Sequence, residues 1–422
     1  MDTIYRRARA VDVKRFHGPL KNFEHMTVDT SAQDLDGVMA DLARDPSVEY
    51  VQPNYLLYAD GAAPEAVPCY IKGIPLPPGC GEANPTPGAG PSLPGKGSRP
   101  GVDPRPADVV GGGDPQLDLA WGIGKIGAPQ AWAKTRGSRS VIVAVIDTGI
   151  DYNHPDLAAN VWRNPNFGRT RATGVDADAT TAITGDLVGW DFVHDDNLPY
   201  DDFGHGTHVS GTIGAVGNNG VGVSGVSQRV SIMAVKFLGS SGSGDTAAAI
   251  RGIDYALSRG AKVLNNSWGG KGGTNAALRD AVQRSADAGA LFVASAGNDG
   301  TNDDTDVSFP ASFDVSNMIT VAATTSNDTL ALFSNTGART VHLGAPGVSI
   351  YSTLPGGKYG KMSGTSMAVP HVSGAAALLW AAHPELTASQ VKQRLPRTGD
   401  PLPSLQGKTV TGRRLNIQRA LE

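Results

Sequence analysis

Three residues far apart in the chain are of the types that nucleophilic catalysis by a serine requires. Asp147 ends an apolar run (VIVAVID), His205 lies in a glycine-rich stretch (DDFGHGTHVSG), and Ser366 precedes a long segment of small apolar residues (SGTSMAVPHVSGAAALL). A serine attacks a carbonyl when a base takes its proton and a carboxylate orients that base. Each residue also has a structural explanation, because Thr365 or Ser366 could cap a helix, Asp147 could cap a turn, and a lone histidine can be structural.

The segments around these residues predict an α/β fold. Short, continuous apolar runs rich in β-branched residues indicate parallel strands that are buried on both faces, and they occur at residues 141–146, 230–237, 262–266, 290–294, 318–322 and 341–343. Helical stretches lie between them, notably at residues 206–216, 245–259 and 275–288. This alternation predicts a doubly wound, mostly parallel sheet with helices on both faces, and ligands bind beyond the carboxyl ends of such strands.

The segment after Ser366 predicts a helix that is buried on all sides. Residues 367–380 are almost entirely Ala, Val, Leu and Gly. Ser366 would then lie at the N-terminus of this helix, where free N–H groups and the helix dipole favour developing negative charge. We expect Pro370 in the first turn, where a missing N–H costs little.

Length and charge narrow the classes of function. The chain has 422 residues, which suits one large domain with an accessory unit, and its formal net charge of -4 offers no basic face for nucleic acid. Apolar runs are too short for a membrane span, and no signal-peptide pattern is visible. The two cysteines, Cys69 and Cys80, would form a surface disulfide in an oxidising compartment in preference to remaining free thiols.

Composition divides the chain into three parts. Residues 1–60 predict a small α+β unit, with a strand near residues 23–30, a helix ending at Arg44, and an extended return over residues 48–58. Residues 61–113 are rich in Pro and Gly and predict an extended linker that is open to proteolysis. Residues 114–422 hold the large domain.

From residue 114 onward the chain resembles the subtilisin-like serine proteases. Five blocks carry this resemblance, in order: VIDTGI, GHGTHVSGT, NNSWGG, ASAGN and SGTSMAVPHVSG. The chain order Asp, His, Ser is that of subtilisin. The resemblance implies a peptidase in which Ser366 is the nucleophile, His205 the base and later the acid, and Asp147 the residue that fixes the imidazole tautomer. Asn298 matches the side-chain donor of the oxyanion hole, with the Ser366 N–H as the second donor.

The resemblance also implies a cleft that binds a peptide substrate as an added strand between two segments. The residues that match these segments and the S1 pocket, which holds the side chain before the cleaved bond (P1), are Gly242, Ser243, Gly244, Ser267, Trp268, Gly269, Ala296, Gly297 and Ser308. Small walls favour a medium or large apolar P1 residue, and Asp299 at the rim could tolerate Lys or Arg. Thr246 and Ala249 resemble the wall of the S4 pocket, so we expect broad endopeptidase activity on polypeptides.

Structural calcium is the cofactor that the resemblance implies. The residues that match its tight site are Asp114, Asp156, Val216, Asn219, Val221 and Val223, which would offer only oxygen ligands. Asp191 and Asp196 resemble a second, weaker site, although His194 stands where a further Asp is expected. His205 and His208 are one helical turn apart, but a catalytic zinc is not expected, because no third ligand has zinc-like spacing and because His208 and His371 match structural histidines of the family.

Residues 1–60 resemble the second half of the inhibitor-like propeptide of these proteases. We therefore expect the N-terminal unit to template folding of the large domain and to block its cleft until a cut is made, at an unplaced point between residues 58 and 113. The resemblance implies a secreted monomer, with a truncated N-terminus explaining the missing signal peptide. The alternative is a catalytically silent peptide-binding protein of the same fold. A further hypothesis, compatible with the protease, is that residues 1–60 act as a protease inhibitor, which the isolated segment would show by inhibition in trans.

Overall fold

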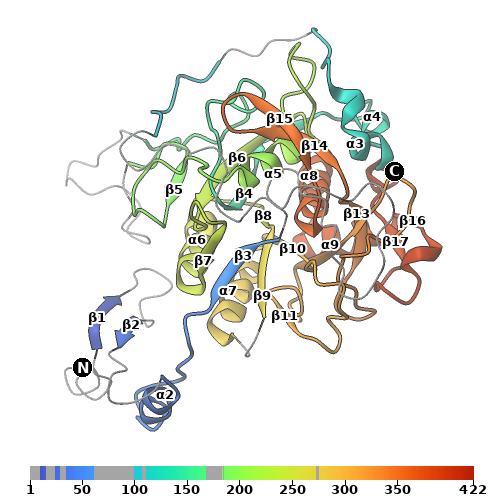
Figure 1. The fold of residues 1–422 in the computed structure, drawn as a ribbon. Coiled ribbons are helices and arrows are strands. Elements are labelled where there is room, and N and C mark those ends of the chain that lie inside the picture. Colours follow the sequence, from blue (N-terminus) through green and yellow to red (C-terminus); the bar gives the residue numbers. More distant parts are fainter. Residues whose placement is uncertain are drawn as a thin grey trace, which may run out of the picture.

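The computed structural model describes residues 10–15, 24–28, 35–60, 99–106, 111–167, 183, 185–271 and 275–422 (Figure 1). Cys69 and Cys80, and with them the expected disulfide, lie outside these residues. Within the described residues, no helix is long and apolar enough to cross a membrane.

A nine-stranded sheet forms the centre of the large domain. Its strand order is β16-β17-β13-β12-β10-β8-β4-β6-β5, and every neighbouring pair is parallel except β16 and β17. The bounds of these strands are β4 Gly137–Asp147, β5 Gly189–Asp191, β6 Arg229–Lys236, β8 Val263–Asn266, β10 Leu291–Ser295, β12 Met318–Thr324, β13 Leu343–Pro346, β16 Asp400–Pro401 and β17 Arg413–Arg414. The predicted α/β fold with a mostly parallel sheet is confirmed.

Helices cover both faces of this sheet (Figure 1). In β4, Val143 and Val145 pack into one hydrophobic core, and Ala144 and Ile146 pack into the other. The first core contains α5 (His205–Gly214), α8 (Thr365–Ala382) and α9 (Ala388–Arg397), and the second contains α6 (Thr246–Ser258) and α7 (Ala276–Asp287). Because both faces are covered, the centre of β4 is apolar on both sides over residues 143–146 and shows no polar alternation there.

Smaller elements complete the large domain. They are η2 Leu117–Leu119, α3 Trp121–Lys125, α4 Ala128–Ala131, β7 Ser243–Asp245, β9 Trp268–Lys271, β11 Ser308–Phe309, β14 Ile350–Leu354, β15 Lys358–Met362, η3 Pro403–Leu405 and α10 Ile417–Ala420. Strands β14 and β15 form a hairpin beside α5 (Figure 1).

Helix α8 runs through the middle of the molecule and positions Ser366 in its first turn. Every residue from Thr365 to Trp380 is buried, as the small apolar side chains predict. Pro370 is the sixth residue of this helix, and therefore lies in the second turn and not in the first. Its missing N–H leaves the Ser366 carbonyl without a helical donor. The Ser267 hydroxyl donates to that carbonyl instead, at 3.0 Å.

The N-terminal unit contains β1 (Ala10–Arg15), β2 (Glu24–Val28) and α2 (Leu35–Leu42), and it lies to one side of the large domain (Figure 1). Strands β1 and β2 are antiparallel, and α2 buries Val38 and Leu42 in a small core. The predicted extended return is shorter than expected, because only β3 (Leu56–Ala59) is a strand, after turns at residues 43–49.

Strand β3 leaves this unit and enters the large domain. It is the third strand of a four-stranded sheet with the order β11-β9-β3-β7, and it is antiparallel to both β9 and β7. Figure 1 shows β3 crossing in front of the large sheet toward the start of α8. The N-terminal unit therefore contributes a strand to the domain that follows it.

Candidate active site

His205 and Asp147 form a buried pair where β4 ends and α5 begins. The His205 Nδ1–H donates to Asp147 Oδ1 at 2.8 Å, and both side chains are 0% exposed. Asp147 Oδ1 also accepts from the Thr148 N–H at 2.7 Å, which holds the carboxylate in place. Burial opposes protonation of His205, but the charge and hydrogen bond of Asp147 outweigh it and raise the pKa of the imidazole. This arrangement fixes Nε2 as the nitrogen that can take a proton.

Ser366 does not hydrogen-bond to His205 in this structure. Its Oγ donates to the Ser267 carbonyl at 2.9 Å. His205 Nε2 and Asp147 Oδ2 have no hydrogen-bond partner within the described part of the chain. A hydroxyl proton that is engaged with the Ser267 carbonyl cannot be donated to His205, so the three-residue arrangement is not formed in this structure.

Asn298 follows β10 and has a fixed amide orientation beside the start of α8. The Thr365 backbone N–H can only donate, and it donates to Asn298 Oδ1 at 2.9 Å, as does the Thr365 hydroxyl at 3.0 Å. With Oδ1 engaged in this way, Nδ2 is the group of the amide that is left to donate to a ligand. The Thr365 hydroxyl oxygen in turn accepts from the Gly297 N–H at 3.2 Å.

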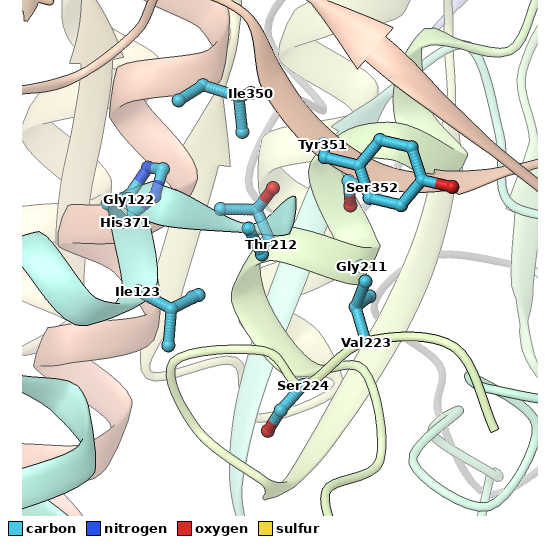
Figure 2. A pocket seen from close by; sticks show the side chains of 11 residues that line it. Gly122, Ile123, Gly211, Thr212, Val223, Ser224, Ile350, Tyr351, Ser352 and His371 are labelled. Carbon is cyan, nitrogen blue, oxygen red and sulfur yellow. The ribbon is translucent and has the colours of Figure 1, made fainter. Parts of the chain in front are cut away.

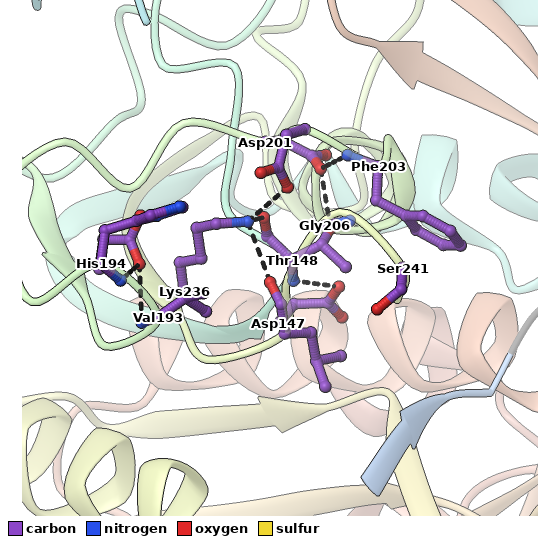
Figure 3. A network of polar contacts seen from close by, with 12 residues as sticks. Asp147, Thr148, Val193, His194, Asp201, Phe203, Gly206, Lys236 and Ser241 are labelled. Atoms are coloured by element: carbon purple, nitrogen blue, oxygen red, sulfur yellow. Dashed lines mark hydrogen bonds and ion pairs between the residues drawn. The ribbon is translucent and has the colours of Figure 1, made fainter. Parts of the chain in front are cut away.

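Asp201 and Lys236, which were not among the residues predicted from the sequence, support this site (Figure 3). Asp201 is buried and accepts from the Thr148 hydroxyl, from the Phe203 and Gly204 N–H groups, and from both donors of Thr207. It therefore joins the end of β4 to the start of α5. Its place four residues before His205, in a polar turn that enters a helix, was the available signal.

Lys236 is fully buried at the end of β6, beside Asp147 in the sheet register. Its ammonium donates to the Thr148 and Leu238 carbonyls at 2.6 and 2.9 Å, and to Asp202 at 2.6 Å (Figure 3). A buried ammonium is tolerated when its donors are all used, as they are here. A lysine at the end of an otherwise apolar strand signals such a role, but its acceptors are known only from the fold.

The two predicted cleft segments lie on either side of β3. Ser243 and Gly244 pair with Tyr58 and Leu57, and the Gly242 carbonyl accepts from the Ala59 N–H at 2.9 Å. On the other side, Gly269 and Trp268 pair with Tyr58 and Ala59, and the Ser267 carbonyl accepts from the Asp60 N–H at 3.1 Å. Residues 56–60 thus lie in the cleft as an added antiparallel strand.

Asp60 follows β3 and reaches both the serine and the predicted pocket. Its carbonyl accepts from the Ser366 N–H at 3.2 Å. Its carboxylate accepts from the Ser295 hydroxyl at 2.5 Å, and a Cβ at Gly269 would lie 3.1 Å from the same carboxylate oxygen. Burial raises the pKa of Asp60 to about 6, although the Ser295 hydrogen bond and the charge of His205 lower it.

The remaining predicted pocket residues lie around Asp60 and β9. Ala296 and Gly297 connect β10 to Asn298, and the Ala296 carbonyl accepts from Asn335 Nδ2 at 3.0 Å. Ser308 lies in β11, which pairs with the far edge of β9. Ser308 also hydrogen-bonds to Asp303. Burial raises the pKa of Asp303 to about 7, and the charge of Asp60 adds to this shift, whereas the hydrogen bond with Ser308 opposes it.

Leu57 occupies a second pocket in the cleft. Its side chain is 0% exposed and packs in the core that contains Ala249, whereas the neighbouring Leu56 and Tyr58 are 60% and 51% exposed. Thr246 contacts the chain just before this point, through its N–H and hydroxyl to the Tyr55 carbonyl. The strand therefore inserts alternate side chains into the domain.

Residues before β3 close the exposed ends of two helices. The Asn54 side chain accepts from the Ala247 N–H in the first turn of α6, at 3.0 Å. The Gln52 side chain accepts from the Ala277 N–H in the first turn of α7, at 3.1 Å, and donates to Asn275. Because the first N–H groups of a helix have no partner within it, these contacts stabilise the docked segment.

The first predicted calcium site brings its side chains together. Asp156 accepts from Asn219 Nδ2 at 2.8 Å and from the Val223 N–H at 2.9 Å, and the Asp156 carbonyl accepts from the Val216 N–H. Asp114 accepts from the Asn219 N–H at 3.2 Å. Burial raises the pKa of Asp156 to about 7, with the charge of Asp114 adding to it.

Two carboxylates that disfavour each other's ionisation, together with the Asn219 amide, form an oxygen-rich donor set that fits a divalent cation. The remaining predicted ligand, Val221, lies in the same loop, where its N–H donates to Asn219 Oδ1 at 2.9 Å. The site residues expected from the sequence thus converge on one loop.

The second predicted calcium site does not fit a metal. The Arg99 guanidinium donates to Asp191 Oδ2 and to the Leu198 carbonyl, both at 2.7 Å, and it also pairs with Asp196. His194 occupies Asp191 Oδ2 as well, at 2.7 Å. The Arg99 side chain is 2% exposed, so its guanidinium takes the position between the carboxylates that a cation would need.

Two further histidines are bound to carbonyls. His208 Nε2 lies 2.9 Å from the Ile350 carbonyl, and burial lowers its pKa to about 3. His371 Nδ1 lies 2.9 Å from the Met367 carbonyl, and burial lowers its pKa to about 4. His371 also lines a pocket beside α5 and β14 (Figure 2), whose interior space of about 10 Å³ is comparable with one water molecule. This pocket is too small for a peptide.

A buried Asp–His pair and a serine at the head of a buried helix, both at the carboxyl ends of parallel strands, are the groups that a serine hydrolase requires. The sequence profile of the Subtilase family matches residues 138–413. Thermitase from Thermoactinomyces vulgaris is 40% identical over 302 residues, covering 72% of this chain and 95% of its own. The subtilisin of Bacillus pumilus is 41% identical over 308 residues, covering 72% and 99%. Subtilisin E from Bacillus subtilis is 41% identical over 282 residues, covering 66% of each chain. The chain therefore belongs to the subtilase family and is a serine-type endopeptidase.

Proposed function

We propose that this protein is a secreted serine endopeptidase of broad specificity, made as a zymogen that processes itself. The observation that carries the proposal is the position of residues 56–60, which lie between β7 and β9 as a bound peptide would. The carbonyl of Asp60 receives the Ser366 N–H, so a peptide carbonyl lies where the attack would take place.

In the proposed reaction, His205 Nε2 takes the Ser366 hydroxyl proton as Oγ bonds to the substrate carbonyl carbon. Asp147 holds Nδ1–H and stabilises the imidazolium, because the two groups are 2.8 Å apart without exposure to water. The oxyanion receives the Ser366 N–H and Asn298 Nδ2. His205 then protonates the leaving amine, and a water molecule, deprotonated by His205, hydrolyses the acyl-enzyme.

We propose a preference for medium or large apolar P1 residues, with loose selection elsewhere. Walls built from Gly269, Ala296 and Gly297 leave room for such a side chain. Leu57 supports an apolar S4 pocket, because its side chain is completely buried among apolar residues. Lys271 pairs with Asp299 at the rim, at 3.2 Å, and partly neutralises the acidic residue that could attract Lys or Arg.

We propose that Asp114, Asp156 and Asn219, with the carbonyls of Val216, Val221 and Val223, hold one structural Ca²⁺. The ion would neutralise two buried carboxylates and tie the loop that follows α5, and it would take no part in peptide hydrolysis. The N-terminal unit acts as an intramolecular inhibitor and folding template for a monomer, since β3 fills the cleft and Gln52 and Asn54 close two helix ends.

A serine-directed fluorophosphonate tests the proposal directly. It is expected to label Ser366 and to abolish cleavage of denatured casein. Ser366→Ala should remain unlabelled, whereas Ser363→Ala, three residues away in the same turn, should keep both labelling and activity. A folded protein that binds casein peptides in the cleft without turnover or labelling would support the peptide-binding alternative and overturn the proposal.

A further inference from the structure

We propose that the bond between Asp60 and Gly61 is the one that this chain hydrolyses in itself, with Asp60 as the P1 residue. The inference rests on the proposed endopeptidase function and places the cut, which the sequence alone left open between residues 58 and 113.

The backbone contacts define the register of the bound segment. Ala59 N–H bonds to the Gly242 carbonyl at 2.9 Å, and Asp60 N–H bonds to the Ser267 carbonyl at 3.1 Å. These two bonds lie on opposite sides of the strand, so they prevent a slip by one residue in either direction. They place the Asp60 carbonyl, and no other carbonyl of the segment, on the Ser366 N–H.

The side chains support the same register. Leu57, three residues before Asp60, is fully buried, and the intervening Tyr58 is half-exposed. A shift by one residue would bring Leu57 to the surface and would place Tyr58 in the apolar pocket. The Asp60 side chain is itself held, because the Ser295 hydroxyl donates to its carboxylate. Two pockets and three backbone bonds therefore select one bond for cleavage.

The chemistry balances with the groups in place. Ser366 Oγ bonds to the Asp60 carbonyl carbon, the bond to the Gly61 nitrogen breaks, and His205 passes the serine proton to that nitrogen. The oxygen of one water molecule then bonds to the Asp60 carbonyl carbon, and the bond from that carbon to Ser366 Oγ breaks. His205 takes one proton of the water and returns it to Oγ, and Asp60 ends in a new carboxyl group. The products are residues 1–60, with a new C-terminal carboxylate, and residues 61–422, with a new amino terminus.

The test follows the first cut in the full-length chain. Denatured protein is diluted into refolding buffer, quenched in acid at increasing times, and its intact masses are measured. The earliest fragments should be residues 1–60 and 61–422, whose masses sum to that of the chain plus one water. Their rate of appearance should be independent of protein concentration, because the bond lies in the cleft of its own chain. Ser366→Ala should give no fragments.

Substitutions on either side of the bond sharpen the test. Asp60→Leu, which suits an apolar pocket, should cut after the same residue and faster, whereas Ala63→Leu should leave the rate unchanged. Gly61→Pro should abolish this pair of fragments, because the leaving nitrogen becomes part of a ring. Ala63→Pro should retain them.

First fragments that end at any residue other than 60 would overturn the inference. If Ser366 still reacts with a fluorophosphonate and casein is still cut, the endopeptidase function survives that result. If the refolded protein shows neither labelling nor fragments, both the proposed function and this inference fail.

Discussion

Ser366 and Ser267 exchange two hydrogen bonds: the Ser366 hydroxyl donates to the Ser267 carbonyl, and the Ser267 hydroxyl donates to the Ser366 carbonyl. The second bond exists because Pro370 has no N–H to offer that carbonyl. The hydrogen bond that Pro370 cannot make is therefore replaced by one from Ser267. The carbonyl of the same residue also accepts from the backbone N–H of Asp60.

We predict that Ser267→Ala lowers the free energy of unfolding by about 1–3 kcal/mol, because it leaves the buried Ser366 carbonyl without a donor. Denaturant unfolding on the Ser366→Ala background, which prevents self-digestion, measures this change. The exposed Ser389→Ala in α9 is the control and should change stability by no more than about 0.5 kcal/mol. Equal effects of the two variants would contradict the role of Ser267.

The bound segment should be released more easily as pH rises from about 4 to about 6. Burial raises the pKa of Asp60 from 3.8 to about 6 in the cleft, so the cleft binds the protonated carboxyl better than the charged one. The affinity of the segment is then highest below the pKa of free Asp60, falls through this window, and levels off above it, by about 100-fold in all.

A fluorescent peptide that competes for the cleft of the Ser366→Ala chain measures this release across pH 4–8. Asp60→Asn is the matched variant, because it keeps the shape and removes the charge. The groups that act on Asp60 from the facing elements are His205, Asp147 and Asp299. Their own titration remains in Asp60→Asn, so an unchanged pH profile in that variant would show that Asp60 is not responsible.

We predict that the region around Asp191 is stable without metal because Arg99 supplies its positive charge. Arg99→Ala should cost about 3–5 kcal/mol, since it removes the guanidinium that pairs with the buried Asp191 carboxylate. Thermal unfolding of the Ser366→Ala chain should then show part of the loss recovered in millimolar Ca²⁺. Arg251→Ala, which breaks a more exposed pair with Asp195, should cost about 1 kcal/mol or less. An Arg99→Ala protein of unchanged stability would refute this explanation.

Chelation should destabilise the protein through the first calcium site. EDTA is expected to lower the unfolding midpoint, and Asp156→Asn should make the midpoint insensitive to both EDTA and Ca²⁺. The reason is that the amide removes one of the two negative charges that would hold the ion. Asp299→Asn, at the exposed cleft rim, should keep the full response. A calcium response in Asp156→Asn equal to that of the parent would exclude this site.

The elements of the large domain could be predicted well because its strands are buried on both faces. Continuous runs such as residues 141–146 have no other common explanation, and their carboxyl ends place Asp147 and Asn298 at one edge. Strand β13 starts at Leu343, two residues after its predicted start at residue 341. The prediction was early because Val341, in the segment before the strand, is equally apolar and buried.

Contacts between distant polar residues could not be predicted in the same way. Arg99 lies in a Pro- and Gly-rich stretch that indicated only a linker, yet residues 99–106 are packed on the large domain. Arg105 donates to the Ala159 and Val161 carbonyls at 2.9 and 2.8 Å. No periodicity marks such residues, because their partners come from loops rather than from a helix or strand face. Asp201 and Lys236 stand at positions that signal a role, a turn before a helix and the end of a strand, but their partners are likewise known only from the fold.

Strand β3 is also a ligand that is covalently attached to the domain it binds. Before the cut, residues 61–98 connect it to Arg99, which is anchored on the same domain, so the cleft meets its occupant at a high and constant effective concentration. After the proposed cut, the same segment would be an independent molecule that has to find the cleft by diffusion. The fraction of open enzyme would then depend on how far the products are diluted. Hydrolysis of one bond would thus change the occupancy of the cleft from a quantity that is independent of protein concentration into one that depends on it.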